Sequence, residues 1–317
     1  RRQRQMCIRD RITKVLNVDI WNFMHFLVPG ALAYALSGNA VIGFLVAVGC
    51  GIVALFFSQW LAPKWGEFFG LEGTTCTTLA FCAWVYPVTY GLNKIIDLIP
   101  GLRDVDVNVD KLGKKLGIFG DPAVIGLLVG VFLALLTRQD LGALLTIGMG
   151  VAASMVLIPR MVSVMMEGLT PMGNAANDYM HRKIGDDADI YIGMDIALGL
   201  GDPACITCSA IMIPVTILLA FLIPDMRFFP LGILAEVCYL APMCVLTSKG
   251  NIFRTLICMT VMMFITLFFA NMFIPEATQM LSVTGVKFEG LVTASHFGWN
   301  PGNLLVSLLH RLFGMLG

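Results

Sequence analysis

The chain has 317 residues, a formal net charge of +0 and only 13% charged residues, whereas 57% are hydrophobic and the mean hydropathy is +0.82. This apolar fraction is far above that of soluble domains, so a soluble enzyme is excluded. The balanced charge gives no indication of nucleic-acid binding. The motif G-x-x-x-x-G-K-[S/T] does not occur in the sequence, which argues against ATP bound to this chain as an energy source. We expect an integral membrane protein without a metal ion or a cofactor.

The chain begins with a basic segment, 1–14, that lacks the apolar stretch of a signal peptide and differs in composition from the rest of the chain. Seven apolar stretches then reach or approach the ~20 residues that a membrane-spanning helix needs. These stretches are 21–37, 40–61, 121–137, 141–158, 204–224, 229–247 and 252–273. The first of them is short and carries Asn22 and His25.

The positive charges fall almost entirely on one side of the membrane if residues 66–99 form a re-entrant hairpin followed by an interfacial helix. The crowded side then holds the basic residues of the loops 1–14, 62–65, 94–119, 160–183 and 249–254. The other side holds Arg138, Arg227 and Lys287, and Arg311 lies in the C-terminal tail. A helix that crossed the membrane at 84–99 would destroy this sorting. Because cytoplasmic loops carry an excess of Lys and Arg, we place the crowded side in the cytoplasm.

An internal repeat is indicated by two matches at the same spacing of 212 positions. Gly38-Asn39 and Gly250-Asn251 each separate two apolar stretches, and Leu55-Phe56-Phe57 matches Leu267-Phe268-Phe269. The second copy would begin near Phe119 and contain an odd number of spans, so the two copies would have opposite orientations, as in many secondary transporters. The first copy would then begin about 90 residues before the first residue of the chain. Chance similarity between two apolar hairpins is the alternative.

The predicted architecture is an all-α integral membrane protein, an inverted-repeat transporter with re-entrant hairpins and with scaffold and core domains. The chain is predicted to begin with a cytoplasmic N-terminal segment of foreign appearance (1–14). The end of the first repeat follows, with two core spans, the re-entrant hairpin and the interfacial helix (15–100), and then a cytoplasmic loop (101–119). Scaffold spans with an amphipathic linker helix at 160–185 come next (120–187), and the core spans of the second repeat with a second hairpin complete the prediction (188–317). Asp104, Asp106 and Asp110 in the loop are solvated surface or a docking patch for a soluble partner.

Three segments predict irregular backbone at membrane depth, where a substrate could bind. The first, 70–78, combines a carboxylate with two glycines and four threonines. Glycines allow backbone to approach a ligand, and hydroxyls with a carboxylate suit a polyhydroxy compound. Threonine is also common at helix contacts in membranes. The substrate-binding candidates of this segment are Glu72, Gly73, Thr74, Thr77 and Thr78.

The second segment, 193–203, contains two aspartates and three glycines. An ionisable side chain inside a membrane is costly and usually functional, so Asp195 and Asp202 are candidates. The alternative for Asp202 is that it caps a helix that begins at Pro203.

The third segment, 295–303, places polar groups beside aromatic ones, and its candidates are His296 and Asn300. The alternative is that its aromatic residues belong to a membrane-interface belt. His25 and Glu236 lie inside apolar stretches; each is a further site candidate or a polar group satisfied by a neighbouring helix.

Six motifs, in order over nearly the whole chain, match one known family: Asn17-Val18-Asp19-Ile20-Trp21-Asn22 with His25, Phe68-Phe69 followed by Leu71-Glu72-Gly73, Phe119-Gly120-Asp121-Pro122, Gly168-Leu169-Thr170-Pro171, Gly193-Met194-Asp195, and Gly250-Asn251-Ile252-Phe253-Arg254-Thr255-Leu256-Ile257. With these motifs the chain resembles the galactitol-specific enzyme IIC components of the bacterial phosphotransferase system. The resemblance implies a dimeric, multi-pass channel subunit of the bacterial inner membrane, surrounded by membrane lipid, whose core domain carries the sugar by an elevator-like motion. It also implies a separate IIB subunit, served by IIA, that phosphorylates the sugar from a phosphocysteine. Members of the family carry roughly a hundred further residues upstream.

The chain departs from the family pattern at Thr77-Thr78, Ile196 and Asp202-Pro203, where members carry Pro-His, Pro and His-Thr. We therefore expect galactitol or a related polyol or sugar as the substrate. The alternative function is a stand-alone secondary transporter coupled to H⁺ or Na⁺ through Glu72, Asp195 or Glu236. A membrane-embedded hydrolase lacks support, because HExxH, GxSxG and paired catalytic acids on one helix do not occur.

Overall fold

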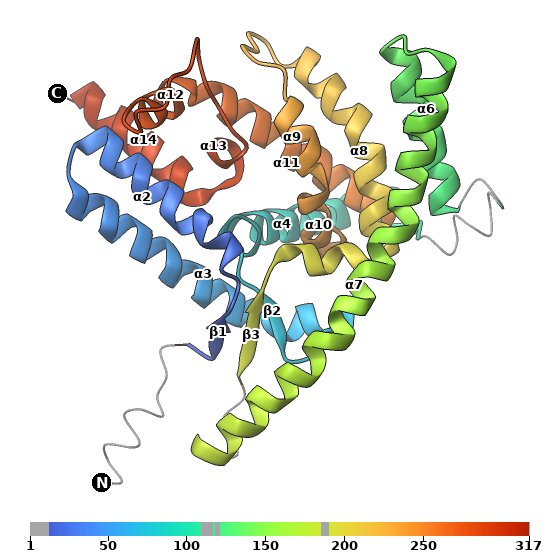
Figure 1. Cartoon of the computed structure of the whole chain (residues 1–317), viewed down its shortest axis with the longest axis horizontal. Coiled ribbons are helices and arrows are strands. Elements are labelled where there is room, and N and C mark those ends of the chain that lie inside the picture. Colours follow the sequence, from blue (N-terminus) through green and yellow to red (C-terminus); the bar gives the residue numbers. More distant parts are fainter. Residues whose placement is uncertain (1–12, 109–116, 118–120, 185–189, 317) are drawn as a thin grey trace.

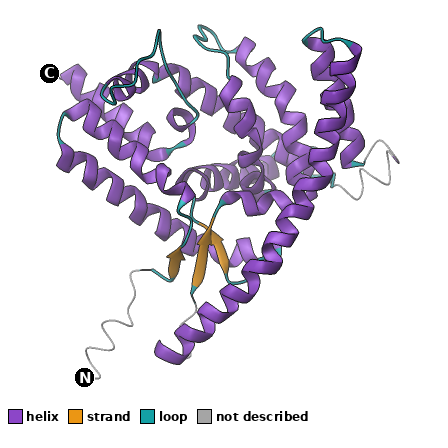
Figure 2. Cartoon of the chain, viewed as in Figure 1, coloured by secondary structure: helices purple, strands orange, loops and turns teal. Residues whose placement is uncertain are grey.

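The computed structural model describes residues 13–108, 117, 121–184 and 190–316. Helices dominate the described chain, and one small sheet lies among them (Figures 1 and 2). The elements are β1 (Val15–Asn17), η1 (Trp21–Phe23), α2 (Met24–Ser37), α3 (Ala40–Phe69), β2 (Thr74–Cys76), η2 (Phe81–Val85), α4 (Tyr86–Leu98), α6 (Pro122–Leu136), α7 (Leu141–Ile184), β3 (Tyr191–Met194), η4 (Ile196–Gly201), α8 (Pro203–Leu222), α9 (Leu231–Glu236), η5 (Val237–Leu240), α10 (Ala241–Thr247), α11 (Ile252–Met272), α12 (Ile274–Ser282), α13 (His296–Trp299) and α14 (Pro301–Leu316).

Three of the described helices are long and apolar enough to cross a membrane, namely α3, α8 and α11. The stretches predicted at 121–137 and 141–158 give shorter apolar helical segments, and the stretch at 21–37 gives the 14-residue helix α2. The stretch predicted as one span at 229–247 is broken into α9, η5 and α10. Pro242, the second residue of α10, has no backbone donor, which is compatible with the first turn of a helix. The molecule is therefore a membrane protein with several apolar helices.

The two Gly-Asn pairs of the predicted repeat form the same kind of turn. Gly38 ends α2 in the left-handed region at a φ of 66°, and the side chain of Asn39 accepts the Val41 amide at the start of α3. Gly250 has a φ of 76°, and Asn251 caps α11 in the same way. Glycine tolerates a positive φ and asparagine is a good N-cap, which explains why both pairs occur between helices. The inverted orientation of complete repeats stays a prediction.

The predicted linker helix at 160–185 is not a separate element. Residues Leu141–Ile184 form one helix of 44 residues, so α7 continues the apolar stretch that precedes it. No glycine or asparagine stands at 158–160 to stop the helix. Pro159 leaves one carbonyl without its helical donor, but internal prolines are tolerated in membrane helices. Figure 1 shows α7 extending past the sheet.

The segment predicted as a re-entrant hairpin followed by an interfacial helix contains a strand, a π-helical turn and a helix. Helix α3 continues to Phe69 and ends at Gly70, whose φ is 66°. The chain then forms β2, a π-helical turn (η2) and α4. The strands pair in the order β1-β3-β2, and both pairings are parallel. The described chain is thus mostly helical, as expected of an all-α membrane protein, and it contains in addition one small parallel sheet of three short strands.

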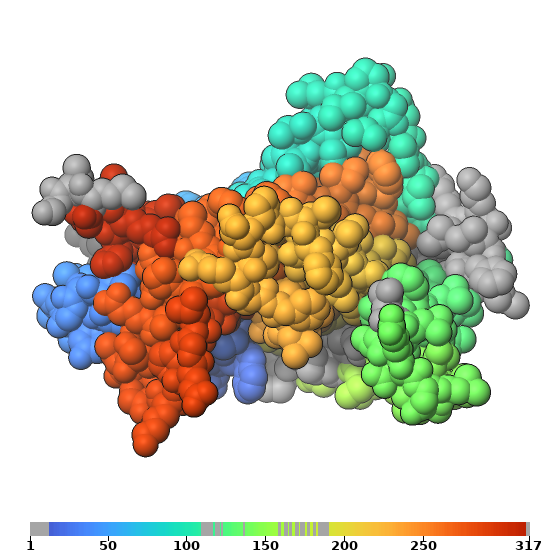
Figure 3. Space-filling model, turned by 90° about the horizontal axis from the view of Figure 1, so that it is seen from above, coloured from blue at the N-terminus to red at the C-terminus, as the bar shows by residue number. Residues whose placement is uncertain are grey.

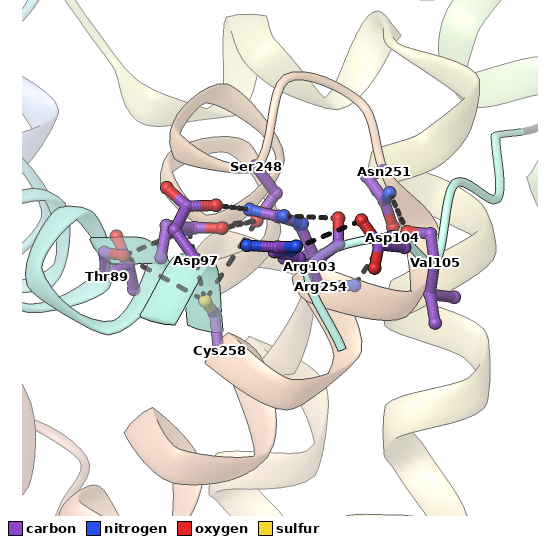
Figure 4. Close-up of polar contacts among 10 residues, drawn as sticks. Thr89, Asp97, Arg103, Asp104, Val105, Ser248, Asn251, Arg254 and Cys258 are labelled. Atoms are coloured by element: carbon purple, nitrogen blue, oxygen red, sulfur yellow. Dashed lines mark hydrogen bonds and ion pairs between the residues drawn. The ribbon is translucent and has the colours of Figure 1, made fainter. Parts of the chain in front are cut away.

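Arginine residues form hydrogen bonds at both ends of α11. At its N-terminal end, Arg254 donates to a carboxylate oxygen of Asp97 at 2.7 Å and to the Arg103 carbonyl at 2.9 Å (Figure 4). At its C-terminal end, the Arg227 amide donates to the Asn271 side chain at 2.9 Å. The hydrogen bond from Arg254 is the main reason why the pKa of Asp97 is lowered. The teal segment that carries Arg103 projects from the surface beside α11 (Figure 3).

Candidate functional site

The carboxyl ends of the three strands meet at one edge of the small sheet. Because all strands are parallel, the chain leaves each of them in the same direction. Strand β1 is followed by Asp19, β2 by Thr77 and Thr78, and β3 by Asp195. The sheet therefore gathers polar residues from three distant parts of the sequence at one place.

Thr77 and Thr78 form hydrogen bonds that connect the chain segments at this edge. The Thr77 hydroxyl donates to the Asn17 side chain at 3.0 Å, and the Thr77 amide donates to the Met194 carbonyl at 3.0 Å. The Thr78 hydroxyl accepts the Ile196 amide at 3.3 Å. Both threonines are buried. Their hydroxyls are thus engaged with protein groups, and they position the segment that comes after β3.

Gly193 makes the close approach of these strands possible. A Cβ atom at this position would lie 2.3 Å from Cγ2 of Thr77 and 3.1 Å from Cα of Asn17. The first distance is too short for a real Cβ atom, and the second is tighter than most real contacts. The glycine that the sequence places in the second candidate segment therefore serves strand packing.

A cavity of about 50 Å³ lies next to this edge, and it brings together four of the predicted site residues. His25 comes from the start of α2, Asp195 from the end of β3, Glu236 from the end of α9, and His296 from α13. The rings of His25 and His296 face each other with centroids 4.8 Å apart. The remaining lining residues are Trp21, Asn22, Met24, Phe81, Ile196, Tyr239 and Trp299.

Three buried nitrogen atoms of the cavity wall have no hydrogen-bond partner among the described residues. They are Nδ1 of His25, Nε2 of His296 and Nε1 of Trp299. Leaving a buried polar atom unsatisfied costs roughly 1–3 kcal/mol, and native structures rarely retain such atoms. These nitrogens are therefore available to hydrogen-bond water or a polar ligand in the cavity.

The second hairpin is held against the rest of the site by close packing. The Asn300 side chain donates to the His25 carbonyl at 2.9 Å, which joins the end of α13 to α2. A Cβ on Gly298 would lie 2.0 Å from the Thr266 carbonyl oxygen of α11. Trp299 packs on Phe81 with ring centroids 5.3 Å apart. Through its hydrogen bond to the backbone, Asn300 thus helps to fix the position of His25.

The cavity is lined by carboxylates, which accept hydrogen bonds, and by imidazoles, which can donate or accept them. One oxygen of Asp195 accepts the Ala197 amide at 2.7 Å and caps η4, which leaves the second oxygen for a ligand. Glu236 supplies a second carboxylate, and a neutral imidazole donates at one nitrogen and accepts at the other. Within the described residues, no group of three His, Cys, Asp or Glu side chains could hold a metal ion. This set of groups suits a ligand rich in hydroxyls.

Four predicted site residues lie away from the cavity. Glu72 and Gly73 belong to the turn before β2, at the opposite end of the strand, and Glu72 is exposed. The Thr74 hydroxyl donates to the Leu71 carbonyl in that turn. Asp202 accepts the Ala204 amide at 2.8 Å and caps α8, as the structural alternative for this residue predicts.

Sequence reasoning missed part of the wall, notably Trp21, Asn22 and Tyr239. The first two lie in the run 17–22, which alternates polar and apolar residues directly before an apolar stretch. The Asp19 carboxylate accepts the Asn22 amide at 3.2 Å and holds this run in place. The sequence pattern that could have identified Trp21 and Asn22 is a run of polar and aromatic residues at the start of a short apolar stretch. Tyr239 carries no signal of this kind.

Comparisons with known proteins show the family to which the chain belongs. Residues 7–290 match the family described as PTS system sugar-specific permease component, so the match begins inside the predicted N-terminal segment. Over 292 residues, 92% of the chain, it is 34% identical to the PTS system galactitol-specific EIIC component of Escherichia coli (strain K12), and the same values hold for the protein of that name from Escherichia coli O157:H7. The chain spans 64% of the length of these two relatives. No solved structure gives a significant match. The chain belongs to the family of PTS system sugar-specific permease components.

Proposed function

We propose that this chain is the membrane subunit of a sugar phosphotransferase system and binds a polyol such as galactitol in the cavity between His25 and His296. The polyol would cross the membrane and be presented to a separate cytoplasmic IIB protein, itself recharged by IIA, that holds the phosphoryl group. The family match and the name of the Escherichia coli relatives support this proposal. In this view the protein lies in the bacterial inner membrane.

The observation that carries the proposal is the convergence of four polar side chains from separate elements on one cavity. His25, Asp195, Glu236 and His296 come from α2, β3, α9 and α13, and the two imidazoles have buried nitrogens that lack a partner among the described residues. A polyol such as galactitol carries a hydroxyl on every carbon. Each hydroxyl can donate one hydrogen bond and accept up to two. A polyol would satisfy these groups together, whereas an apolar solute would satisfy none.

The size of the cavity implies that binding requires motion. A volume of about 50 Å³ holds only a few water molecules, since one needs roughly 10–15 Å³, and small-molecule sites usually measure ~300–1,000 Å³. The structure therefore corresponds to a closed arrangement of the site. We propose that the hairpin formed by α13 and α14 moves relative to α2 when sugar enters, as part of an elevator-like movement of a core domain in an inverted-repeat homodimer.

Calorimetry with galactitol on the purified protein tests the binding site. Asp195→Asn should weaken binding by roughly ten- to a hundredfold, because a charge-assisted hydrogen bond contributes ~1.5–3 kcal/mol and 1.4 kcal/mol is a factor of ten. His296→Gln should weaken it by roughly two- to tenfold, since a neutral hydrogen bond contributes ~0.5–1.5 kcal/mol. Glu72→Gln is the matched control, because Glu72 is exposed at the far end of β2.

The result that contradicts the proposal is wild-type affinity in both cavity variants. Loss of binding in Glu72→Gln alone would instead move the site to the turn before β2. A variant that fails to elute as a single species in size-exclusion chromatography is replaced by Glu236→Gln, which probes the same cavity from another helix.

Ion-coupled transport is the second candidate function, and the position of Glu236 favours it. Its carboxylate lines the cavity and could exchange a proton or bind Na⁺ as the sugar moves. Under this alternative, Glu236→Gln would still bind galactitol, but uptake into proteoliposomes would no longer depend on pH or Na⁺. Under the phosphotransferase proposal, uptake needs the phosphorylated IIB protein and does not respond to an ion gradient.

A further inference from the structure

A second and larger pocket lies outside the candidate sugar site, where the end of α3 meets α4 and α10. Its volume is about 570 Å³. It is lined by Lys64, Glu67, Phe68, Tyr86, Tyr90, Leu246, Thr247 and Lys249. None of these residues lines the cavity between His25 and His296. The pocket is therefore separate from the proposed sugar site.

The residues that line the pocket include more cations than carboxylates. Among the described residues, no carboxylate lies within ion-pair distance of Lys64 or Lys249. Glu67 is the one carboxylate among the lining residues, and it is exposed. Lys94, one turn beyond Tyr90 on α4, adds a further positive charge nearby. The pocket thus presents an excess of positive charge.

Aromatic rings hold the principal cation in a fixed position. The ammonium nitrogen of Lys64 lies 4.1 Å from the ring centroid of Trp60, 5.3 Å from that of Tyr86 and 5.7 Å from that of Tyr90. A cation over an aromatic ring is stabilised without losing its charge. Lys64 is therefore oriented before any ligand arrives, unlike a lysine that moves freely on a surface.

The length of α3 places this pocket at the level of the lipid headgroups. The 20 residues from Val41 to Trp60 span about 30 Å as a helix, which is the thickness of the hydrocarbon core. Val41, Phe44 and Phe56 in this stretch are 64%, 67% and 70% exposed, as expected of side chains that face lipid. Trp60 is where an interfacial aromatic residue is expected, and Lys64 lies one turn later.

We propose that this pocket, formed by Lys64, Tyr86, Tyr90 and Lys249, binds the phosphate headgroup of an anionic phospholipid from the leaflet on the side of the clustered positive charges. The charge of the pocket is complementary to the phosphate. Its position next to a lipid-facing helix allows the acyl chains to lie along the apolar surface of α3. Basic pockets on the cytoplasmic side of membrane helices bind such headgroups in other proteins. The site is independent of the sugar proposed for the cavity.

Native mass spectrometry of the purified protein tests the proposal. The protein is delipidated in an uncharged detergent and titrated with phosphatidylglycerol or with phosphatidylcholine that carries the same acyl chains. The wild type should retain phosphatidylglycerol at least tenfold more tightly. Lys64→Gln and Lys249→Gln should each lower that affinity about fivefold, equivalent to about 1 kcal/mol for each basic residue near a membrane surface.

Three further variants sharpen the test. Glu67→Gln should bind phosphatidylglycerol as tightly as the wild type or more tightly, since it removes the opposing charge. Lys64→Arg combined with Lys249→Arg should retain the preference, which separates loss of charge from misfolding. Lys287→Gln, on an exposed loop predicted to lie on the opposite side of the membrane, is the control and should change nothing.

Two outcomes would overturn the proposal. One is equal retention of the two lipids by the wild type, or an unchanged preference in Lys64→Gln/Lys249→Gln. The other is full displacement of phosphatidylglycerol by inorganic phosphate or by a soluble phosphoprotein at equal concentration. That result would make the pocket a site for soluble anions or for a protein partner.

Discussion

At the scale of single residues, Gly193 has a strict packing requirement that a substitution elsewhere can relieve. Its missing side chain allows β3 to approach Thr77, directly after β2, and Asn17 of β1 at the same point. The polar ends of the strands, and hence Asp195, depend on this approach. The contact is unusual in that one of the two crowding atoms, the Cγ2 methyl of Thr77, can be removed by a conservative substitution.

We expect Gly193→Ala to lower the free energy of unfolding by roughly 1–3 kcal/mol, the usual range for overpacking. The added Cβ would lie 2.3 Å from Thr77 Cγ2. Thr77→Ser removes that methyl and keeps the hydroxyl that donates to Asn17, so the double variant should recover much of the loss. Thermal unfolding in detergent measures both effects. Gly49→Ala, at a position with nothing within 4 Å of the added atom, is the control. Equal melting temperatures for wild type and Gly193→Ala would show that the strands are not packed as described.

The sequence predicted the residue types of the site better than their grouping. His25 and Glu236 were candidates because they lie inside apolar stretches, Asp195 and His296 because they lie in segments of predicted irregular backbone, and all four line the cavity. Glu72 was a candidate because it lies in another such segment. It lies on the other end of a three-residue strand, and composition alone cannot tell one end of a strand from the other.

At the scale of elements, ion pairs and hydrogen bonds between side chains connect helices that follow one another with breaks between them. The junction of α11 and α12 is joined to α14 by Arg311, which donates to Glu276 at 2.9 Å through Nη2 and also contacts the other carboxylate oxygen. Glu276 is nearly fully buried, with 5% of its side chain exposed, whereas 31% of the Arg311 side chain is exposed. Removing only the arginine would leave a buried negative charge without its partner.

Arg311→Met should therefore lower the free energy of unfolding by roughly 3 kcal/mol, the lower end of the range for breaking a buried ion pair. Replacing both partners, in Arg311→Met/Glu276→Met, should restore most of the stability, because the buried charge is gone. Chemical denaturation in mixed micelles compares the three proteins. A double variant that is less stable than the single variant would contradict this account of the pair.

A second tie, between α4 and α11, should depend on pH. The hydrogen bond from Arg254 holds the pKa of Asp97 below its ordinary value of 3.8, and the positive charges of Arg254, Lys94 and Lys249 act in the same direction. A group with a lowered pKa stabilises the folded state above its ordinary pKa, and this contribution is lost as the pH falls through the lowered value.

Asp97→Asn should accordingly have a lower melting temperature than the wild type between about pH 5 and pH 7, and the difference should shrink in more acidic solution. Melting curves in detergent from about pH 7 down to about pH 3 measure it. Glu289→Gln, which changes an exposed loop carboxylate, provides the comparison. A difference between Asp97→Asn and wild type that grows towards low pH would have the wrong sign.

Sequence patterns predicted the helices but not the sheet or the breaks. Strands of three or four residues are too short to show alternation of apolar and polar side chains, and β1, β2 and β3 lie far apart in the sequence. The break at 237–240 carries no glycine, and its only local signal is Pro242. Long apolar helices such as α8 and α11 were predicted within two residues of their bounds, because continuous hydrophobicity needs no tertiary information.

At the scale of the whole molecule, the sorted charges predict an orientation in the membrane. Arg254 and Lys249 lie at one end of α11, and Arg227 contacts Asn271 at the other end. Because α11 is long enough to cross the bilayer, these two ends should face opposite compartments. The positive-inside rule assigns the end with Lys249 to the cytoplasm.

Cysteine labelling in intact cells measures this orientation. In a background without the nine native cysteines, Arg227→Cys should react with a membrane-impermeant maleimide, and Lys249→Cys should react only after the cells are permeabilised. Both positions are exposed, so access through the membrane decides the result. The opposite labelling pattern would reverse the orientation, and labelling of both would show that α11 does not span the bilayer.

The uninterrupted helix α7 has a mechanical consequence. Its 44 residues measure about 66 Å, roughly twice the hydrocarbon thickness. It packs against η4, directly after Asp195, and it precedes β3 in the chain. A rigid rod that pivots where it packs against η4 acts as a lever, so a tilt of about 5° displaces a point about 33 Å away by roughly 3 Å. That displacement is comparable to the length of a hydrogen bond. A displacement of one end of α7 can thus be transmitted to the segment that carries Asp195 without any local rearrangement of the helix.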